Sequence, residues 1–293
     1  MVKKIRHFLE FIGFGFALIL LRFTLPFQWS TALAGWIGRT LGPRFLPRSA
    51  LAMANLEKCF PTSTEAQRKA IVVEMWDNYA RFIVEYMNPE PFWDGQTLHH
   101  IEIVGAEHLK NLFEDGKPGI LFTAHYGNWQ MALLAARSMG YDITQFYKAT
   151  NNPLSDRIMQ YCQKLTVKKV ITRQEGPKAL LSLLKRKEHV LILVDQKDGG
   201  GLSVPFLGHN AMTANGWARI AQSQDCPLLP VRSERLSGFT FRVTFYPPMT
   251  VPQSGDTQKD IYDFLLAVNT MIGEWIRERP GQWFWLHRRW KDS

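Results

Sequence analysis

The sequence predicts an α/β domain in which helices flank a sheet, preceded by helical and apolar segments. From Ile101 onwards, short β-prone runs alternate with stretches of helical period, which is typical of an α/β layer. The chain has 293 residues, enough for one large domain with a substantial core. The clearest unit is residues 118–140, where a Pro-Gly pair, an apolar run, a polar turn and an Ala/Leu-rich stretch ending at Gly140 indicate a strand followed by a helix.

The same patterns place the other elements in order. Residues 30–95 have helical spacing, with Ser63 or Thr64 as the cap of the longest helix, over 64–87. Strands are expected at 101–104, 120–124, 143–147, 169–172, 190–194, 227–231 and 239–245. Helices are expected at about 106–114, 128–139, 153–166, 176–187, 213–223 and 257–279.

An apolar run at residues 8–25 precedes these elements. Glu10 and Arg22 interrupt it, so it is short of the about 20 apolar residues that a spanning helix needs. We interpret residues 1–29 as an uncleaved membrane anchor, which either spans the bilayer or lies half-immersed in it; a soluble core helix is the alternative. Residues 30–293 then form one domain, helical over 30–95 and α/β over 96–293.

The charge of the chain favours an anionic partner. Lys plus Arg is 35 against 26 for Asp plus Glu, a net charge of +9, and the first fifty residues carry seven basic groups against Glu10 alone. Basic groups beside an apolar run favour an anionic membrane surface, and an acidic carrier protein would also be attracted. No nucleic-acid motif is present, so nucleic acid is not an expected partner. The three cysteines are scattered, which favours a reducing compartment without a disulfide framework.

His125 lies in the turn between the strand and the helix of residues 118–140. In an open α/β sheet this turn is at the carboxyl end of a strand, where ligands collect. A histidine there, beside the backbone N–H groups of a helix start, can move a proton next to a developing negative charge. The alternative is a core histidine satisfied by a backbone carbonyl.

Residues 125–130, His-Tyr-Gly-Asn-Trp-Gln, are similar to the H-x4-D/E signature of glycerolipid-type acyltransferases. Five further blocks follow the order of one branch of that superfamily: 55–56 with 59–61, 146–148 with 152–154, 195–196, 204–208 and 282–290. Together the blocks resemble the lauroyl/myristoyl acyltransferases of lipid A biosynthesis. The resemblance implies a mixed sheet flanked by helices, as in glycerolipid acyltransferases.

This resemblance also implies a reaction. A fatty acyl chain would move from acyl carrier protein to the hydroxyl of a 3-hydroxyacyl chain on a lipid A precursor, on the cytoplasmic side of the bacterial inner membrane. Two rivals stay open: the same chemistry on another glycolipid, such as a phosphatidylinositol mannoside, and a catalytically inactive lipid-binding or scaffold protein of the membrane.

Acyl transfer to a hydroxyl needs a base and donors for an oxyanion. His125 is the expected base, and the N–H groups of Gly127 and Asn128 are the expected donors. Gln130 stands where the family carries an acidic residue, close enough in sequence to meet His125. Either it replaces a natural glutamate in an engineered chain, which we favour, or the chain is a natural variant in which another carboxylate orients the histidine, with Asp195 the candidate.

Several side chains could bind substrate. Asp195 and Gln196 end a predicted strand, although a turn-forming aspartate before a glycine loop is the alternative. The basic candidates could equally be solvated surface charges, and the tryptophans of 283–290 could meet the membrane, a phosphorylated sugar or the sheet. The substrate-binding candidates are Asn128, Lys148, Arg173, Gln196, Arg219, Arg288 and Arg289.

Other chemistries lack their motifs. The sequence has no G-x-S-x-G elbow, P-loop, strand-linked dinucleotide fingerprint or H-E-x-x-H pair. Covalent and metal mechanisms therefore have little support, and we expect no cofactor and no metal.

Overall fold

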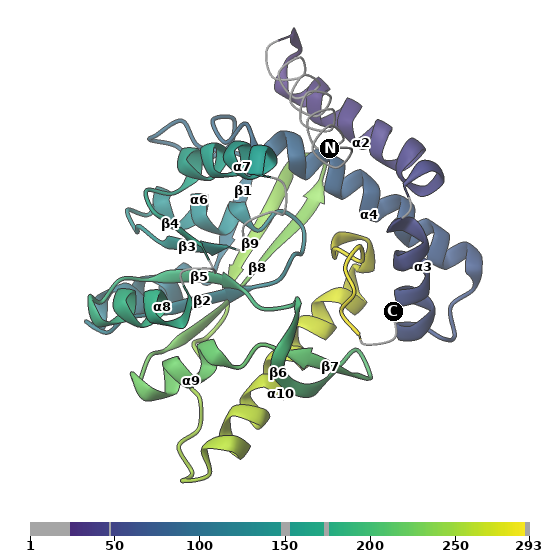
Figure 1. Ribbon diagram of the computed structural model, residues 1–293. Helices are drawn as coiled ribbons and strands as arrows, with labels where there is room; N and C mark the ends of the chain where they lie inside the picture. Colours follow the sequence, from purple (N-terminus) through teal and green to yellow (C-terminus); the bar gives the residue numbers. More distant parts are fainter. Residues whose placement is uncertain (1–23, 47, 148–152, 173–175, 291–293) are drawn as a thin grey trace.

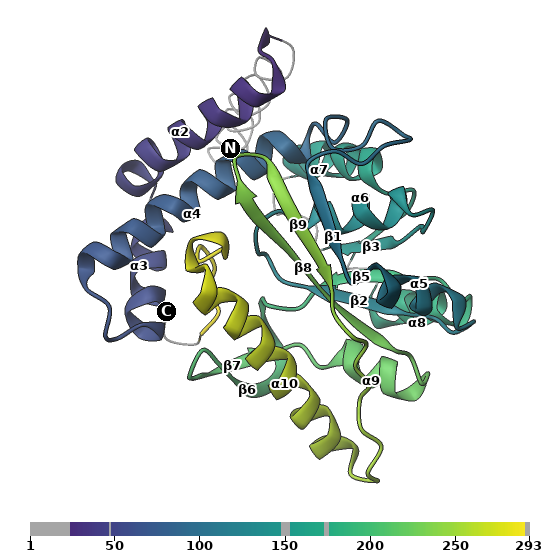
Figure 2. The same cartoon turned by 180° about the vertical axis from the view of Figure 1, so that it is seen from behind.

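A computed structural model describes residues 24–46, 48–147, 153–172 and 176–290. Its centre is a seven-stranded sheet in the order β1-β9-β8-β2-β5-β3-β4, which is parallel except where β8 and β9 run antiparallel (Figures 1 and 2). The strands are β1 (Ile101–Val104), β2 (Ile120–Thr123), β3 (Thr144–Tyr147), β4 (Val170–Thr172), β5 (Val190–Leu193), β8 (Leu228–Ser237) and β9 (Thr240–Phe245). The predicted α/β class and mixed sheet are confirmed.

Helices cover both faces of this sheet because the side chains of its central strands alternate between two cores. On β2, Ile120 and Phe122 face one core with α8, α9 and α10, whereas Leu121 faces the other with α5 and α6. The helices of this part are α5 (Ala106–Glu114), α6 (Gln130–Ser138), α7 (Pro153–Thr166), α8 (Gly176–Lys185), α9 (Gly216–Ser223) and α10 (Thr257–Glu278). All six were expected, within a few residues.

A two-stranded antiparallel hairpin, β6 (Lys197–Phe206) and β7 (His209–Thr213), was not predicted. Three glycines at 199–201 and Pro205 favour a loop locally, but pairing with residues 209–213 overrides that preference. Because β7 continues to Thr213, α9 begins three residues later than expected, at Gly216. β8 is also longer than expected, since pairing with β9 extends it to Ser237.

Between residue 24 and the sheet, the described chain forms three helices: α2 (Phe27–Phe45), α3 (Arg48–Cys59) and α4 (Glu65–Tyr86). The predicted cap of α4 is correct, because Thr64 and Gln67 exchange side-chain and backbone hydrogen bonds as a capping box. Almost all of the apolar run at 8–25 lies outside the described residues. Among the helices that are described, none has both the length and the apolar character to cross a membrane.

Candidate active site

The register of two central strands brings His125 and Asp195 to one edge of the sheet. β2 and β5 are parallel neighbours in which Thr123 is aligned with Leu193, and each site residue lies two positions further on. Since parallel strands end at the same edge, both side chains start from adjacent points of the backbone.

Asp195 holds the His125 imidazole in one orientation. Its Oδ1 lies 2.7 Å from His125 Nδ1, and its Oδ2 accepts the backbone N–H of His125 at 2.9 Å. The carboxylate is fully buried, whereas the imidazole is 18% exposed. Because an ionised carboxylate only accepts hydrogen bonds, Nδ1 carries the proton and the Nε2 lone pair is left for a substrate. The partner of His125 is therefore a carboxylate, and the alternative of a core histidine bonded to a carbonyl is wrong.

The environment keeps Asp195 ionised. Burial alone would raise the pKa of this carboxyl, but the charge and hydrogen bond of His125 hold the pKa well below its usual range. The indole N–H of Trp283 also donates to Asp195 Oδ2, at 2.7 Å. Asp195 is thus a fixed negative charge behind the imidazole at neutral pH.

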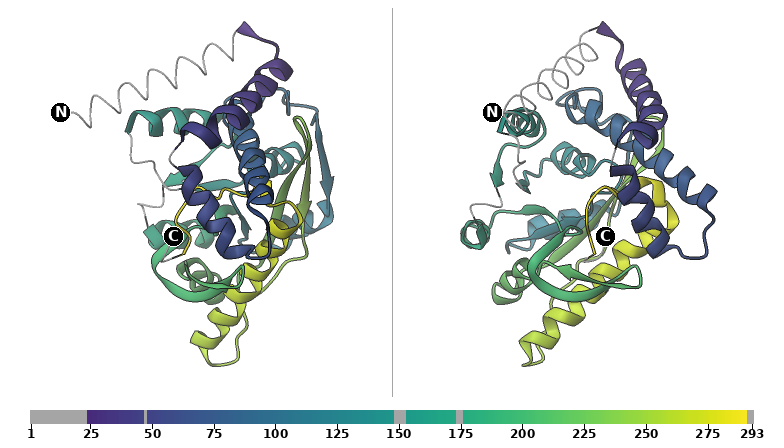
Figure 3. Two further views of the ribbon diagram at one scale, coloured as in Figure 1. Left: turned by 90° about the vertical axis from the view of Figure 1, so that its right-hand side faces the viewer. Right: turned by 45° about the vertical axis from the view of Figure 1, so that its right-hand side comes forward.

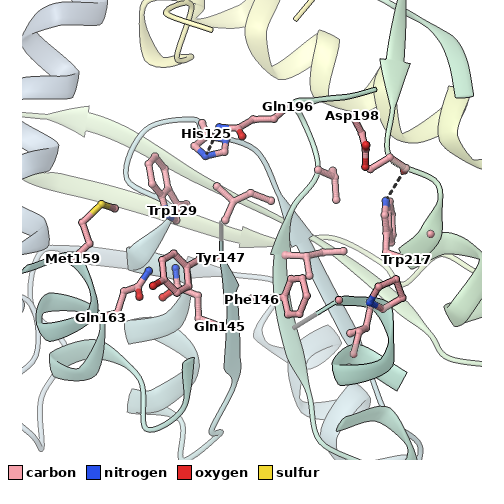
Figure 4. Close-up of a pocket in the computed structure, with 18 of the residues that line it drawn as sticks. His125, Trp129, Gln145, Phe146, Tyr147, Met159, Gln163, Gln196, Asp198 and Trp217 are labelled. Carbon is pink, nitrogen blue, oxygen red and sulfur yellow. Dashed lines mark hydrogen bonds between the residues drawn. The ribbon is translucent and has the colours of Figure 1, made fainter. Parts of the chain in front are cut away.

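His125 opens onto a cavity of about 650 Å³, a size usual for ligand sites (Figure 4). Gln196 stands at its rim, with its amide Nε2 donating to His125 Nε2 at 3.2 Å. One part of the wall is apolar: Phe146, Leu180, Ile192, Trp217 and Ile220. Another part is polar and uncharged: Tyr86, Gln145, Tyr147 and Gln163. A base therefore faces a cavity that can hold both an acyl chain and uncharged polar groups.

With this geometry in place, sequence comparison decides the class of protein. The family model described as bacterial lipid A biosynthesis acyltransferase matches residues 1–292. The chain belongs to this family. It is an acyltransferase of lipid A biosynthesis, as the resemblance predicts.

Similar relatives cover nearly the whole chain. The lipid A biosynthesis lauroyltransferase of Escherichia coli K12 is 26% identical over 98% of this chain and 92% of its own. The palmitoleoyltransferase of the same organism is 25% identical over the same shares. A lipid A biosynthesis acyltransferase of Haemophilus influenzae is 26% identical over 92% of this chain and 84% of its own.

Gln130 of this acyltransferase does not meet His125. It is the first residue of α6, is 1% exposed, and its Nε2 donates to Oε1 of Gln145 on β3 at 3.5 Å. No hydrogen bond between Gln130 and His125 occurs in the part of the chain that is described. The expected contact is wrong because the imidazole is turned toward the end of β5, whereas the first turn of α6 directs residue 130 toward β3.

Restoring an acid at position 130 is therefore expected to bring no gain. We expect Gln130→Glu to change the rate of acyl transfer less than about threefold, because the new carboxyl would be buried among neutral amides, away from the imidazole. Transfer rates of the two proteins under saturating substrates test this. A rate of transfer at least about a hundredfold higher in Gln130→Glu would instead identify residue 130 as the partner of His125.

The polar groups of the turn after His125 are used in hydrogen bonds that hold the fold together, which the sequence did not indicate. Asn128 is fully buried, donates to Glu85 Oε2 at 3.0 Å, and accepts the backbone N–H of Gln130. Arg235 forms a buried ion pair with the same Glu85. The Gly127 N–H donates to the carbonyl of Gln282 at 2.9 Å, so it is not available as the expected oxyanion donor.

None of the three basic candidates in the described part of the chain lines the cavity. Arg289 is fully buried and donates to the Met212 carbonyl and to Thr213 Oγ1, so it holds the C-terminal segment to β7. Arg219 and Arg288 are exposed, and neither lines the cavity. Lys148 and Arg173 lie outside the described residues.

Trp283 is a positioning residue that the sequence did not identify as such. It lies 88 residues after Asp195, is 1% exposed, and stacks edge-on with Trp285. No spacing rule connects the two positions. Of the roles considered for this tryptophan-rich segment, packing over the sheet is the one that Trp283 has, with the carboxylate of the site as its hydrogen-bond partner.

Replacing Trp283 by phenylalanine is expected to lower kcat about tenfold with little change in KM. Phenylalanine keeps most of the packing but removes one donor to a buried carboxylate, an interaction that contributes about 1.5–3 kcal/mol. Steady-state kinetics check this. Trp285→Phe is the matched control, because its indole donates to the Pro280 carbonyl and not to Asp195. Equal losses in both variants would contradict a positioning role.

Proposed function

We propose that this acyltransferase moves a fatty acyl chain from acyl carrier protein to the hydroxyl of a 3-hydroxyacyl chain on a lipid A precursor. The reaction would occur on the cytoplasmic side of the bacterial inner membrane. One observation carries the proposal: a carboxylate-held imidazole faces a cavity whose wall has an apolar part and an uncharged polar part, with Arg48 and Asp198 also lining it. The names of the relatives, lauroyltransferase and palmitoleoyltransferase, support a fatty acyl donor.

His125 acts as the general base. Its Nε2 takes the proton of the acceptor hydroxyl as that oxygen attacks the thioester carbonyl, and Asp195 stabilises the imidazolium that forms. When the tetrahedral intermediate collapses, the C–S bond breaks and the imidazolium returns the proton to the thiolate of the carrier. Ester and thiol are the only products, and no acyl-enzyme forms. Proton transfer of this kind contributes about 10²–10⁴ in rate.

Gln196 is proposed as an oxyanion donor in place of Gly127. In the free enzyme its amide occupies the position at His125 Nε2 where the acceptor hydroxyl must arrive. The hydroxyl displaces this amide, which then lies beside the reacting carbonyl and can donate to the developing oxyanion.

The two walls of the cavity suit the two substrates. Phe146, Leu180 and Ile192 offer an apolar surface for the acyl chain. The amide and phenol groups of Tyr86, Gln145 and Gln163 suit the uncharged polar groups of the acceptor. The net charge of +9 favours approach of an acidic carrier protein.

Asp195 also argues against an inactive scaffold. That rival was motivated by Gln130, but the carboxylate that a catalytic histidine needs comes from β5 instead. We therefore favour a natural variant over an engineered chain.

Labelled acyl-carrier thioester offered with a lipid A precursor, in vesicles and in detergent micelles, tests the function. We expect a labelled ester on the precursor, identified by mass spectrometry. Ester on other glycolipids alone would move the proposal to a different acceptor, and no ester on any acceptor would favour the scaffold.

A further inference from the structure

Helix α2 buries small residues and exposes large apolar ones. Its inner face, packed on α4, is made of Ser30, Thr31, Ala34, Gly35, Gly38 and Gly42. A Cβ added at Gly38 would lie 2.3 Å from the Trp76 carbonyl oxygen, and one at Gly42 would lie 2.4 Å from the Trp76 ring. The glycines therefore allow α4 to approach closely.

The outer face of α2 carries the large side chains. Trp29 is 63% exposed, Trp36 52% and Leu41 45%, and their spacing places them with Leu33 and Ile37 on one side of the helix. Of the ten exposed large hydrophobic residues in the described part of the chain, seven lie between residues 25 and 46. We call the five residues Trp29, Leu33, Trp36, Ile37 and Leu41 the α2 stripe.

This arrangement is the reverse of a helix in a water-soluble protein, whose apolar stripe faces the core. Small residues four apart at a helix contact, as in Ala34, Gly38 and Gly42, are typical of helices that pack in lipid. Tryptophan combines an apolar ring with a polar N–H and concentrates at membrane interfaces. An exposed apolar patch of this size is itself a mark of an interaction surface.

We propose that the α2 stripe inserts into the interfacial layer of an anionic bilayer, with the helix lying along the surface. This rests on the proposed function in one respect, that the acceptor is a membrane lipid. A one-sided stripe favours a helix in the plane of the interface over a spanning one. The helix contains no acidic residue, and its two basic residues are Arg44 and Arg39, the latter paired with Asp77 of α4, so its charge is compatible with anionic lipid. The one-sided apolar stripe with its tryptophans is what favours lipid over a protein partner.

The position of α2 fits this role. It lies at the edge of the molecule, outside α4 (Figure 3), and only its first residue, Phe27, is packed against Phe239 in the turn between β8 and β9. The chain runs from its end directly into α3, whose first residue, Arg48, donates to the Leu286 carbonyl and lines the cavity. Docking of α2 on a bilayer would thus bring the cavity wall close to the lipids that contain the acceptor.

A fluorescent label on the stripe tests the contact in the full chain. Leu33→Cys would carry an environment-sensitive dye, and Glu107→Cys on α5, far from α2 in Figure 2, is the control. Burial raises the pKa of the Cys59 and Cys226 thiols to about 12, and Cys162 is 1% exposed, so the introduced thiol reacts selectively near pH 7.5.

With vesicles of phosphatidylglycerol and phosphatidylethanolamine, we expect a blue shift of the dye at position 33 and none at position 107. No shift at position 33 in protein that floats with the vesicles would overturn the proposal. A blue shift already present without vesicles would also overturn the proposal, because the stripe would then be covered by protein. If that shift grows with protein concentration, a second copy of the chain covers the stripe; if it does not, another part of the same chain does.

An activity measurement separates the stripe from the proposed reaction. The double variant Trp29→Ser/Trp36→Ser should form ester at least about tenfold more slowly on vesicle-presented lipid A precursor, yet within twofold of the parent on the same precursor in detergent micelles. Val104→Ser, an exposed apolar position on β1, is the control. Equal rates of parent and double variant on vesicles would overturn the proposal. A vesicle-dependent blue shift without ester on any acceptor would refute the proposed function and leave the lipid contact standing.

Discussion

Asp195→Asn is expected to lower kcat for acyl transfer about 10⁴-fold, the loss that the equivalent neutral change causes in serine protease triads. Asparagine is nearly the same size, so the cavity keeps its shape. It removes the charge that stabilises the imidazolium, and its NH₂ group can turn toward Nδ1 and reverse the tautomer of His125. The rate of ester formation, with a folded protein verified by circular dichroism, measures this.

The control is Asp142→Asn, which removes an exposed carboxylate whose partner is Lys168. We expect its rate to stay within twofold of the parent. A loss of less than tenfold for Asp195→Asn would contradict the role of the carboxylate.

Because the pKa of Asp195 is held below its usual range, the group is ionised throughout neutral pH. Its support for the imidazolium should therefore be lost only well below pH 4, about the ordinary pKa of aspartate.

His125→Ala is expected to abolish measurable transfer, with a loss of about 10³–10⁴ in kcat, because the attacking hydroxyl would then have no base. KM for the thioester should change little, since the apolar wall of the cavity is untouched. Kinetics with a fixed acceptor concentration check both values. His209→Ala is the control, because that imidazole donates to the Lys58 carbonyl, away from the cavity. Transfer by His125→Ala within tenfold of the parent would show that another group is the base.

The local residue pattern predicted the strands and helices of the sheet domain, whereas the order of the strands in the sheet could not be predicted from it. Alternation of β-prone and helical runs located the seven strands of the sheet because each run is apolar and short, and its ends are marked by glycine, proline or polar residues. The β6–β7 hairpin was missed because its stability comes from pairing between strands and not from residue preference. His125 and Asp195 could both be placed at strand ends, but only the alignment of Thr123 with Leu193 shows that those ends are neighbours.

The direction of side chains was harder to predict than their position. Four residues separate His125 from Gln130, a spacing that allows contact, yet the turn directs one side chain toward the end of β5 and the other toward β3. Asn128 and Arg289 were predicted to bind substrate, but both are buried. Their polar groups are hydrogen-bonded to Glu85 and to β7, respectively. Trp283 reaches Asp195 from a distant part of the chain, a contact that no local pattern indicates.

The central claim is that His125 and Asp195 act as one unit, and a double-mutant cycle on kcat tests it most directly. Groups that act as a unit give non-additive losses. We expect the double variant His125→Ala/Asp195→Asn to be no slower than His125→Ala alone, within about threefold. Multiplied losses, with the double variant slower by the further factor that Asp195→Asn causes alone, would show that the two residues act independently and would contradict the account.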